Sequence, residues 1–192
     1  MTAVTYSGYL RLTELLSLQQ PRTPADRPEV RDSERLFIVV HQASETLLSL
    51  ALADLRQIVA TGCEHSSFAH RIERATAVVD TLVEHLALLR DALPAADFLA
   101  FRDQLGSASG AQSAQFQQLF RLTEYVVMAN DERGAAADHH RVARLTDAVR
   151  RWRGTHLEMV AAMIGNRRGT GDTTGARYLA HRITDAPLGA RS

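Results

Sequence analysis

Hydrophobic residues recur at helical spacing through the first half of the chain. One long segment runs from about Ser33 to just before Gly62, with apolar positions three or four residues apart. Ser33 has the side chain of an N-cap, and Gly62 is the first helix breaker in this stretch. A second segment, residues 65–92, repeats the spacing and closes before Pro94. The pattern predicts two long helices.

The same spacing continues to both ends of the chain. We expect a helix over 98–102 capped by Asp97, and helices over 111–129, 139–165 and 176–183. Leucines within residues 1–20 favour a short amphipathic helix, and three prolines in residues 20–33 indicate an extended loop. No segment alternates with the two-residue period of a strand. The chain is therefore predicted to be all-α, a bundle of four main helices with short accessory helices.

Composition narrows the class of protein. The 192 residues fit one domain, which we assign to residues 1–184, with residues 185–192 expected to be a disordered tail. Basic and acidic residues balance at 22 each without a basic run, which argues against a nucleic-acid partner. No apolar run approaches the roughly 20 residues of a membrane span. A single cysteine, Cys63, and the absence of a signal peptide fit a cytoplasmic protein.

Candidate chemistry lies near the C-terminal end. Trp152 and His156 are four residues apart and share one helix face. The loop Gly169–Gly175 holds three glycines and three threonines, so its backbone could approach a ligand closely. These residues suggest a cofactor site. A core histidine followed by a helix cap and a turn would give the same pattern.

Two further pairs with helical spacing occur earlier in the chain. Phe37 and His41 share a face of the first long helix, although a buried histidine bonded to the carboxylate of Glu45 would look the same. Phe98 and Arg102 share a face before a loop of small residues. An arginine there could hold a carboxylate through two hydrogen bonds, or could form a surface ion pair with a neighbouring acid.

In combination and order, these blocks resemble the tryptophan 2,3-dioxygenase family of haem enzymes. The matching blocks are Thr5–Leu10, Leu36–Glu45, Phe98–Arg102 with Ser107–Ser113, and Trp152…His156 with Met163–Gly165 and Gly169–Gly171. The resemblance implies an all-α fold with a haem b pocket in its core. It also implies a homo-oligomer, dimeric or tetrameric, without nucleic-acid or membrane partners.

The resemblance implies a role for each matching residue. His156 would be the axial ligand of the haem iron, and Trp152, Ser109 and Gly110 would lie against the haem. His41 would be the distal histidine that accepts a hydrogen bond from the indole N–H, and Arg102 would bind the substrate carboxylate. The remaining implied substrate contacts are Phe37, Ile38, Val39, Val40, Phe98 and Thr170, with Tyr6 and Tyr9 reaching in from a neighbouring subunit.

The implied activity is insertion of O2 into the indole ring of L-tryptophan or a tryptophan derivative. The chain is shorter than family members, mainly between Tyr125 and Trp152, and Asp172 stands where the family prefers glycine. These departures leave two alternatives open. One is a haem-dependent monooxygenase or peroxygenase acting on an indole or tyrosine-like compound, and the other is a haem-binding protein without catalysis.

Overall fold

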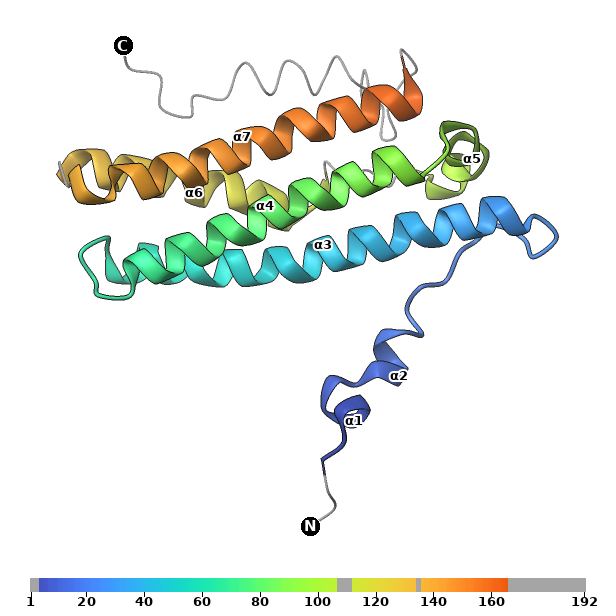
Figure 1. Cartoon of the computed structure of the whole chain (residues 1–192), viewed down its shortest axis with the longest axis horizontal. Coiled ribbons are helices and arrows are strands. Elements are labelled where there is room, and N and C mark those ends of the chain that lie inside the picture. The colour runs from blue at the N-terminus through green and yellow to red at the C-terminus, as the bar shows by residue number, and fades with distance from the viewer. Residues whose placement is uncertain (1–3, 107–111, 134–135, 166–192) are drawn as a thin grey trace.

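Four long helices lie side by side in the computed structural model, which describes residues 4–106, 112–133 and 136–165 (Figure 1). They are α3 (Pro28–Thr61), α4 (Phe68–Ala92), α6 (Ala114–Arg133) and α7 (Ala136–Ile164). The short helix α5 (Ala95–Phe101) and a 3-10 turn (Arg102–Leu105) follow α4 at one end of the bundle. Every regular element within the described residues is helical, which confirms the all-α prediction.

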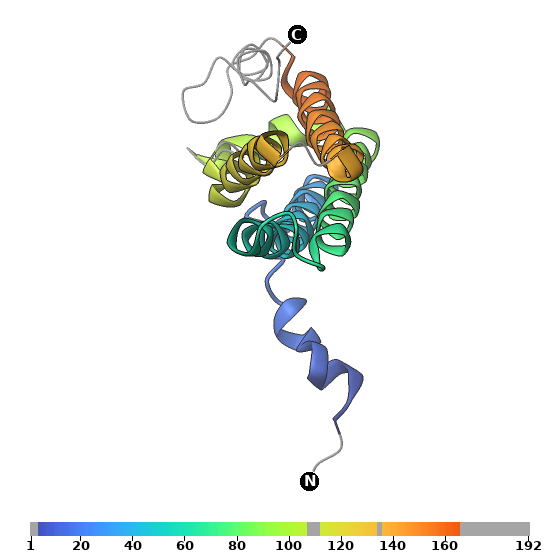
Figure 2. The same ribbon diagram turned by 90° about the vertical axis from the view of Figure 1, so that its left-hand side faces the viewer.

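The core forms where the apolar faces of the long helices meet. α4 packs between α3 and α7, and α6 closes the other side against α3 and α7 (Figure 2). Side chains with almost no exposed surface come from all four helices: Leu48, Leu52 and Leu55 of α3, Ile72, Val79 and Leu82 of α4, Leu119 and Val126 of α6, and Leu145 and Val149 of α7. Burial of these aliphatic groups is the main favourable term in holding the bundle together.

The start of the first long helix differs from its prediction. α3 begins at Pro28 rather than Ser33, because proline suits the first position of a helix, where its missing N–H is not needed. The Ser33 hydroxyl instead donates to the Asp97 carboxylate, with an oxygen–oxygen distance of 2.7 Å. Asp97 is therefore not a helix cap but lies inside the first turn of α5. The predicted end holds, since α3 stops at Gly62, which has a φ of 83°.

Other helix boundaries also differ from the predicted ones. α4 begins at Phe68, three residues after the predicted start, and much of the predicted connection at 130–138 is helical because α6 runs to Arg133 and α7 starts at Ala136. The predicted Gly169–Gly175 loop, the helix over 176–183, the domain end at residue 184 and the tail over 185–192 lie outside the described residues.

The N-terminal residues form an arm that projects away from the bundle (Figure 1). The predicted single helix is two short ones, α1 (Tyr6–Leu10) and α2 (Leu12–Leu15), because Arg11 between them adopts a left-handed conformation with a φ of 51°. Most large apolar side chains of the arm are exposed, including Tyr6 at 76% and Tyr9 at 77%.

The root of the arm is bound to the bundle by a buried acid. Glu34 is 2% exposed, and its carboxylate accepts hydrogen bonds from the backbone N–H groups of Arg22 (2.9 Å) and Thr23 (2.7 Å). Burial raises the pKa of Glu34, but the hydrogen bonds from Thr23 and Arg22 and the charge of Arg31 outweigh it, so its pKa is lowered overall. The carboxylate therefore stays ionised and keeps this segment in place.

Helix α3 bears on the expectation that no apolar run approaches the length of a membrane span. An 18-residue window within it has a mean hydropathy of 1.5, so by length and composition α3 could cross a membrane. Composition alone does not separate a membrane span from the core helix of a bundle. One face of α3 packs against α4 and α6, and only 22% of the window is buried inside the protein.

Candidate active site

His41 of α3 is held in one orientation by its own helix. Its Nδ1 lies 2.8 Å from the carbonyl oxygen of Phe37, one turn earlier, and the two rings are 4.0 Å apart between centroids. A carbonyl oxygen can only accept a hydrogen bond, so Nδ1 carries the proton and donates it. In the neutral ring, Nε2 is then left as a bare acceptor.

The surroundings of His41 keep it neutral. Burial lowers its pKa, and this effect outweighs the hydrogen bond with Phe37 and the charge of Glu45, which both act to raise it. The hydrogen-bond partner of the ring is the Phe37 carbonyl and not Glu45, whose carboxylate accepts a hydrogen bond from the side chain of Gln115 at 2.7 Å. The alternative of a histidine satisfied by Glu45 is therefore wrong for this structure.

Aromatic rings from α5 pack behind Phe37. Its ring centroid lies 5.8 Å from that of Phe98 and 5.6 Å from that of Phe101, and the last two rings meet edge to face at 5.4 Å. Such offset and edge-on pairs are the geometries that aromatic rings prefer. Phe101 is fully buried while Phe37 and Phe98 are half-buried, so the cluster joins the core to the side of the site that His41 occupies.

A second cluster of aromatic rings packs around the other histidine, His156. Trp152 and His156 of α7 stack with centroids 5.1 Å apart and an angle of 12° between planes. Phe116 of α6 also stacks on this tryptophan, with centroids 4.2 Å apart, and the Phe120 ring lies 6.0 Å away. The guanidinium of Arg153 sits 4.0 Å over the Phe120 ring. His156 is thus positioned by a row of flat rings.

His156 is neutral and has an uncommitted ring. Burial, with a smaller contribution from His41, lowers its pKa to about 4. Within the described residues no hydrogen bond to its ring nitrogens occurs, so a lone pair is available to a ligand. The contribution of His41 to this lowering means that the two imidazoles, one on α3 and one on α7, lie near enough to interact electrostatically.

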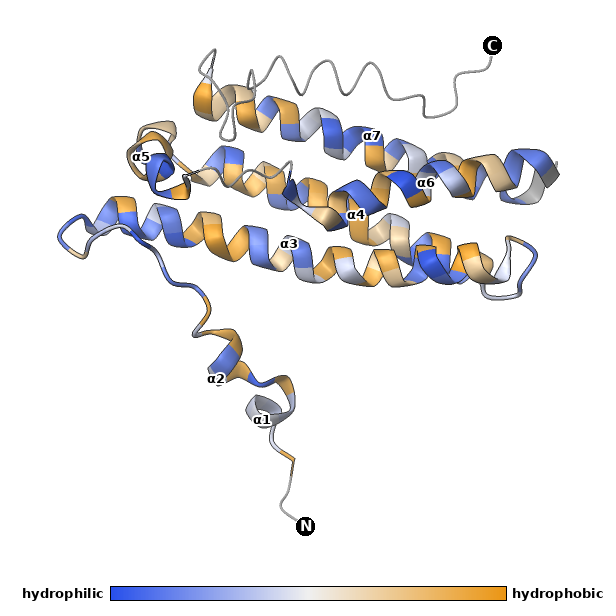
Figure 3. Ribbon diagram, turned by 180° about the vertical axis from the view of Figure 1, so that it is seen from behind, coloured by the Kyte–Doolittle hydropathy of each residue, from blue (hydrophilic) through white to orange (hydrophobic). Residues whose placement is uncertain are grey.

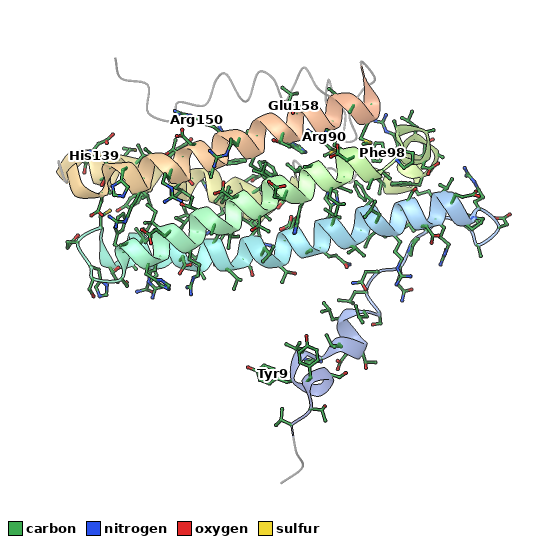
Figure 4. The ribbon with its side chains drawn as sticks, viewed as in Figure 1. Tyr9, Arg90, Phe98, His139, Arg150 and Glu158 are labelled. Atoms are coloured by element: carbon green, nitrogen blue, oxygen red, sulfur yellow. The ribbon has the colours of Figure 1, made fainter. Side chains whose placement is uncertain are left out.

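Arg102 and Phe98 come from the elements next to this site. Arg102 begins the 3-10 turn after α5 and is half-buried, one helical turn from Phe98, whose ring faces Phe37. Figure 4 shows Phe98 at the end of the bundle where α3 begins and α7 ends. The structure therefore brings Phe37, His41, Phe98, Trp152 and His156 to one end of the bundle, with Arg102 adjoining them.

Other predicted residues lie elsewhere or outside the described residues. Val40 is 5% exposed in the core and Val39 is 42% exposed on the outer face of α3, while Ile38 is half-buried. Tyr9 lies on the arm, away from the bundle of its own chain (Figure 4), and Tyr6 is on the same short helix. Ser109, Gly110 and Thr170 fall outside the described residues.

Sequence reasoning missed the supporting rings Phe101, Phe116 and Phe120. The last two are four residues apart, the same spacing as Trp152 and His156, so an aromatic pair on a neighbouring helix was the available signal. A hollow of about 230 Å³ between α3 and α6 is lined by residues such as Ile58 and Tyr125 and contains none of the predicted site residues.

The donor set fits a haem. A haem iron needs a neutral imidazole with a free ring nitrogen as its axial ligand, and His156 meets both conditions. No three residues of the metal-binding types come together within the described part of the chain. The rings of Trp152 and Phe116 pack beside it and make this side of the site apolar.

Known proteins are similar to this chain in sequence. The family model described as tryptophan 2,3-dioxygenase matches residues 1–135. Tryptophan 2,3-dioxygenase of Xanthomonas euvesicatoria is 35% identical over 152 residues, which cover 76% of this chain and 48% of that protein. The protein of that name from Herpetosiphon aurantiacus is 27% identical over 252 aligned positions, covering 94% of each chain. Tryptophan 2,3-dioxygenase 2 of Ralstonia nicotianae is 35% identical over 126 residues, 62% of this chain and 34% of the relative.

The extent of these matches differs in an informative way. The chain spans about half the length of the Xanthomonas relative and a third of the Ralstonia one, but nearly all of the Herpetosiphon protein. A family match over more than two thirds of the chain, together with relatives above 30% identity, settles the family. This chain belongs to the tryptophan 2,3-dioxygenase family.

Proposed function

We propose that this chain is a haem-dependent dioxygenase that inserts O2 into the indole ring of L-tryptophan or a related derivative. The observation that carries the proposal is the pair of neutral histidines at one site, His41 on α3 with a bare acceptor nitrogen and His156 on α7 with an uncommitted ring. Family membership supports the same reaction class.

The α7 side of the site holds the cofactor in this proposal. His156 would hold the haem iron, and Trp152 would adjoin the haem together with Ser109 and Gly110, as the family resemblance implies. The haem supplies the oxygen chemistry when bound. The protein contributes a fixed imidazole, because the Phe116–Trp152–His156 stack holds the ring with its plane nearly parallel to that of Trp152.

The α3 and α5 side binds the substrate. The bare Nε2 of His41 accepts a hydrogen bond from the indole N–H, and the ring of Phe37 packs on the indole. Arg102 binds the carboxylate, which needs the two-pronged donor of a guanidinium, and Thr170 contacts the ammonium and carboxylate groups. Phe98 backs the pocket, and Ile38, Val39 and Val40 complete the segment of α3 assigned to substrate contact. The aromatic cluster excludes water from the reacting face.

The arm belongs to a neighbouring subunit's site in this proposal. Tyr6 and Tyr9 are largely exposed and lie far from the bundle of their own chain, so they contribute to a pocket only in a homo-oligomer. A dimer or tetramer acting in the cytoplasm, with a small aromatic amino acid and O2 as its substrates, is the state that we propose.

The decisive experiment follows product formation by the haem-loaded enzyme. The reduced protein is mixed anaerobically with L-tryptophan, then with air, and N-formylkynurenine is detected by absorbance and mass. We expect product from the wild type and from His139→Ala, a control histidine at the far end of α7 (Figure 4), and a loss of about ten-fold in His41→Ala, because an acceptor for the indole N–H is removed.

Two results would contradict the proposal. A verified ferrous haem protein that makes no N-formylkynurenine over many turnover times excludes the dioxygenase. A hydroxylated product, or turnover of indolic or phenolic compounds that depends on peroxide, would assign the chain to the monooxygenases or peroxygenases instead. A protein that binds no haem would be neither a haem dioxygenase nor a haem monooxygenase or peroxygenase.

A further inference from the structure

A short irregular segment lies between the start of α3 and the 3-10 turn that begins with Arg102. We call this segment, residues 21–23, the strap. Figure 3 shows the chain between α2 and α3 running to the end of the bundle where α5 lies before it turns into α3. Thr23 of the strap has no exposed surface, although residues 24–29 after it are exposed. Backbone groups buried outside regular structure need other partners, and side chains supply them here.

Two side chains of α3 bind the backbone of the strap. The Glu34 carboxylate accepts hydrogen bonds from the N–H groups of Arg22 (2.9 Å) and Thr23 (2.7 Å). The guanidinium of Arg31, three residues earlier on α3, donates to the carbonyl oxygens of Pro21 (3.4 Å) and Thr23. The acid therefore binds the donors of the strap and the arginine binds its acceptors, which fixes the strap against α3.

The Thr23 hydroxyl connects Glu34 to the 3-10 turn. It bonds to the Glu34 carboxylate, which can only accept, so the hydroxyl donates its single proton there. Its oxygen in turn accepts a hydrogen bond from the Gln104 side chain at 3.4 Å. The guanidinium of Arg22 makes a second contact with the turn, because it donates to the carbonyl oxygen of Gln104 at 3.2 Å. Gln104 lies two residues after Arg102.

The short helix before the turn is bound to α3 as well. The Ser33 hydroxyl, next to Glu34 in the sequence, donates to the Asp97 carboxylate in the first turn of α5 at 2.7 Å. The segment that contains Arg102 is thus bound to the same part of α3 at two points, directly at Asp97 and through the strap at Gln104. The place of Arg102 relative to α3 depends on both contacts.

We propose that Glu34 is a positioning residue for Arg102 and acts through the strap. In the proposed function, on which this inference rests, Arg102 binds the substrate carboxylate while His41, seven residues after Glu34 on α3, accepts a hydrogen bond from the indole. The two-pronged contact of a guanidinium with a carboxylate has strict geometry. A displacement of about 1 Å in a binding group can reduce a rate on the order of a hundred-fold. The strap therefore fixes the distance between the two ends of the substrate site.

Two variants break the connection at different points. Glu34→Gln keeps the size of the side chain but places an NH2 group against one of the two N–H donors of the strap. Arg22→Ala removes the bond to the Gln104 carbonyl and leaves Glu34 with both of its backbone donors. Arg22 is exposed, so this change does not open the core. Glu29→Gln is the matched control, an exposed acid in the first turn of the same helix.

Amide hydrogen exchange of the purified chain tests the connection without any ligand. Glu34→Gln and Arg22→Ala should each speed exchange over residues 102–106 several-fold, while Glu29→Gln should match the wild type. Exchange in the middle of α4 should stay as in the wild type, because the turn opens locally and the bundle does not. Unchanged exchange over 102–106 in both variants would overturn the proposal. An equal rise in α4 would overturn it in favour of a purely structural role.

Ligand affinity tests the consequence for the substrate. The Soret band of the haem-loaded protein is followed during titration with L-tryptophan and with tryptamine, which lacks the carboxylate. Glu34→Gln should raise the Kd of L-tryptophan about ten-fold and Arg22→Ala a few-fold, with the Kd of tryptamine changing less than about two-fold. Glu34→Gln added to Arg102→Gln should have no further effect on L-tryptophan, because the two residues act as one unit.

The outcomes separate this inference from the proposed function. A wild-type chain that binds haem but no tryptophan contradicts the proposed function, and hydrogen exchange then decides whether Glu34 positions the turn. A wild type that binds tryptophan, with the same Kd in Glu34→Gln, overturns this inference and leaves the proposed function intact. Equal losses of affinity for L-tryptophan and tryptamine would overturn the assigned connection to Arg102.

Discussion

The two histidines of the site are held in different ways. His41 is fixed by a hydrogen bond from its Nδ1 to the Phe37 carbonyl, so one nitrogen is committed and the other is a defined acceptor. His156 is fixed by stacking on Trp152, and within the described residues neither of its nitrogens is bonded. A hydrogen bond selects a tautomer, whereas stacking fixes the plane of the ring and leaves its tautomer open. His41 therefore presents a defined acceptor, and His156 presents a ring whose nitrogens are not bonded within the described residues.

The largest expected effect separates ligation from recognition. His156→Ala should abolish the Soret band of the reconstituted protein, because no other neutral imidazole occupies the α7 side of the site within the described residues. His41→Ala should retain the band and lose activity instead. Absorption spectra of both variants after haem titration check this. Equal haem retention in both variants would contradict the assignment of the two roles.

The second largest effect is expected on haem affinity, from the ring of Trp152 that stacks on His156. Trp152→Leu keeps an apolar side chain but removes the flat ring that orients His156. Changes to groups that orient a metal ligand typically reduce affinity by roughly ten- to a hundred-fold. Haem transfer to an excess of apomyoglobin measures the loss. The matched change Phe98→Leu, on the His41 side, should leave the rate of haem transfer as in the wild type.

The haem-free protein should lose stability in acid. His156 has a pKa of about 4 in the folded chain, against 6.5 for a histidine exposed to water, so the unfolded chain takes up the proton first. The contribution of neutral His156 to the free energy of unfolding is complete above about pH 6.5. It falls by on the order of 3 kcal/mol as the pH drops toward 4. The lowered pKa of His41 acts in the same direction. Urea unfolding at several pH values should show a shallower decline for His156→Gln, and parallel declines would refute this account.

The smallest effect on stability and activity is expected from Phe98, whose ring packs against Phe37. Phe98→Leu removes one edge-on ring contact while keeping an aliphatic group in the cluster, which should cost about 1 kcal/mol or less of stability. Because Phe98 backs the ring assigned to the indole, KM should rise a few-fold with kcat nearly unchanged. Steady-state kinetics measure this. A fall in kcat without a change in KM would place Phe98 outside the substrate pocket.

Local parts of the site could be predicted from the sequence, and the contacts between helices could not. The pairs Phe37–His41 and Trp152–His156 follow from a spacing of four residues, which fixes neighbours on any helix. That α3 and α7 bring these pairs to one site depends on the packing of the bundle, and only the family resemblance indicated it. The roles of Phe116 and Phe101 required the structure for the same reason.

Some helix ends could likewise be predicted from the sequence, and others could not. Gly62 marked the end of α3 correctly because its conformation with positive φ is one that few other residues adopt. Ser33 and Asp97 both had the side chains of N-caps, but they bond to each other across two helices instead. A capping residue can satisfy either a helix end or a tertiary partner, and the sequence does not say which. The nearby prolines, Pro28 and Pro94, decided where these two helices begin.

The anchoring of the arm by Glu34 has a consequence for assembly. Because the carboxylate binds the backbone of Arg22 and Thr23, and Gln42 holds Leu18, the arm leaves the bundle in a set direction from a short tether. Its exposed tyrosines and leucines therefore explore a small volume, and once two copies meet, their effective concentration for a contact on the partner is high. Much of the entropy that a free tail would lose on docking is already lost in the single chain.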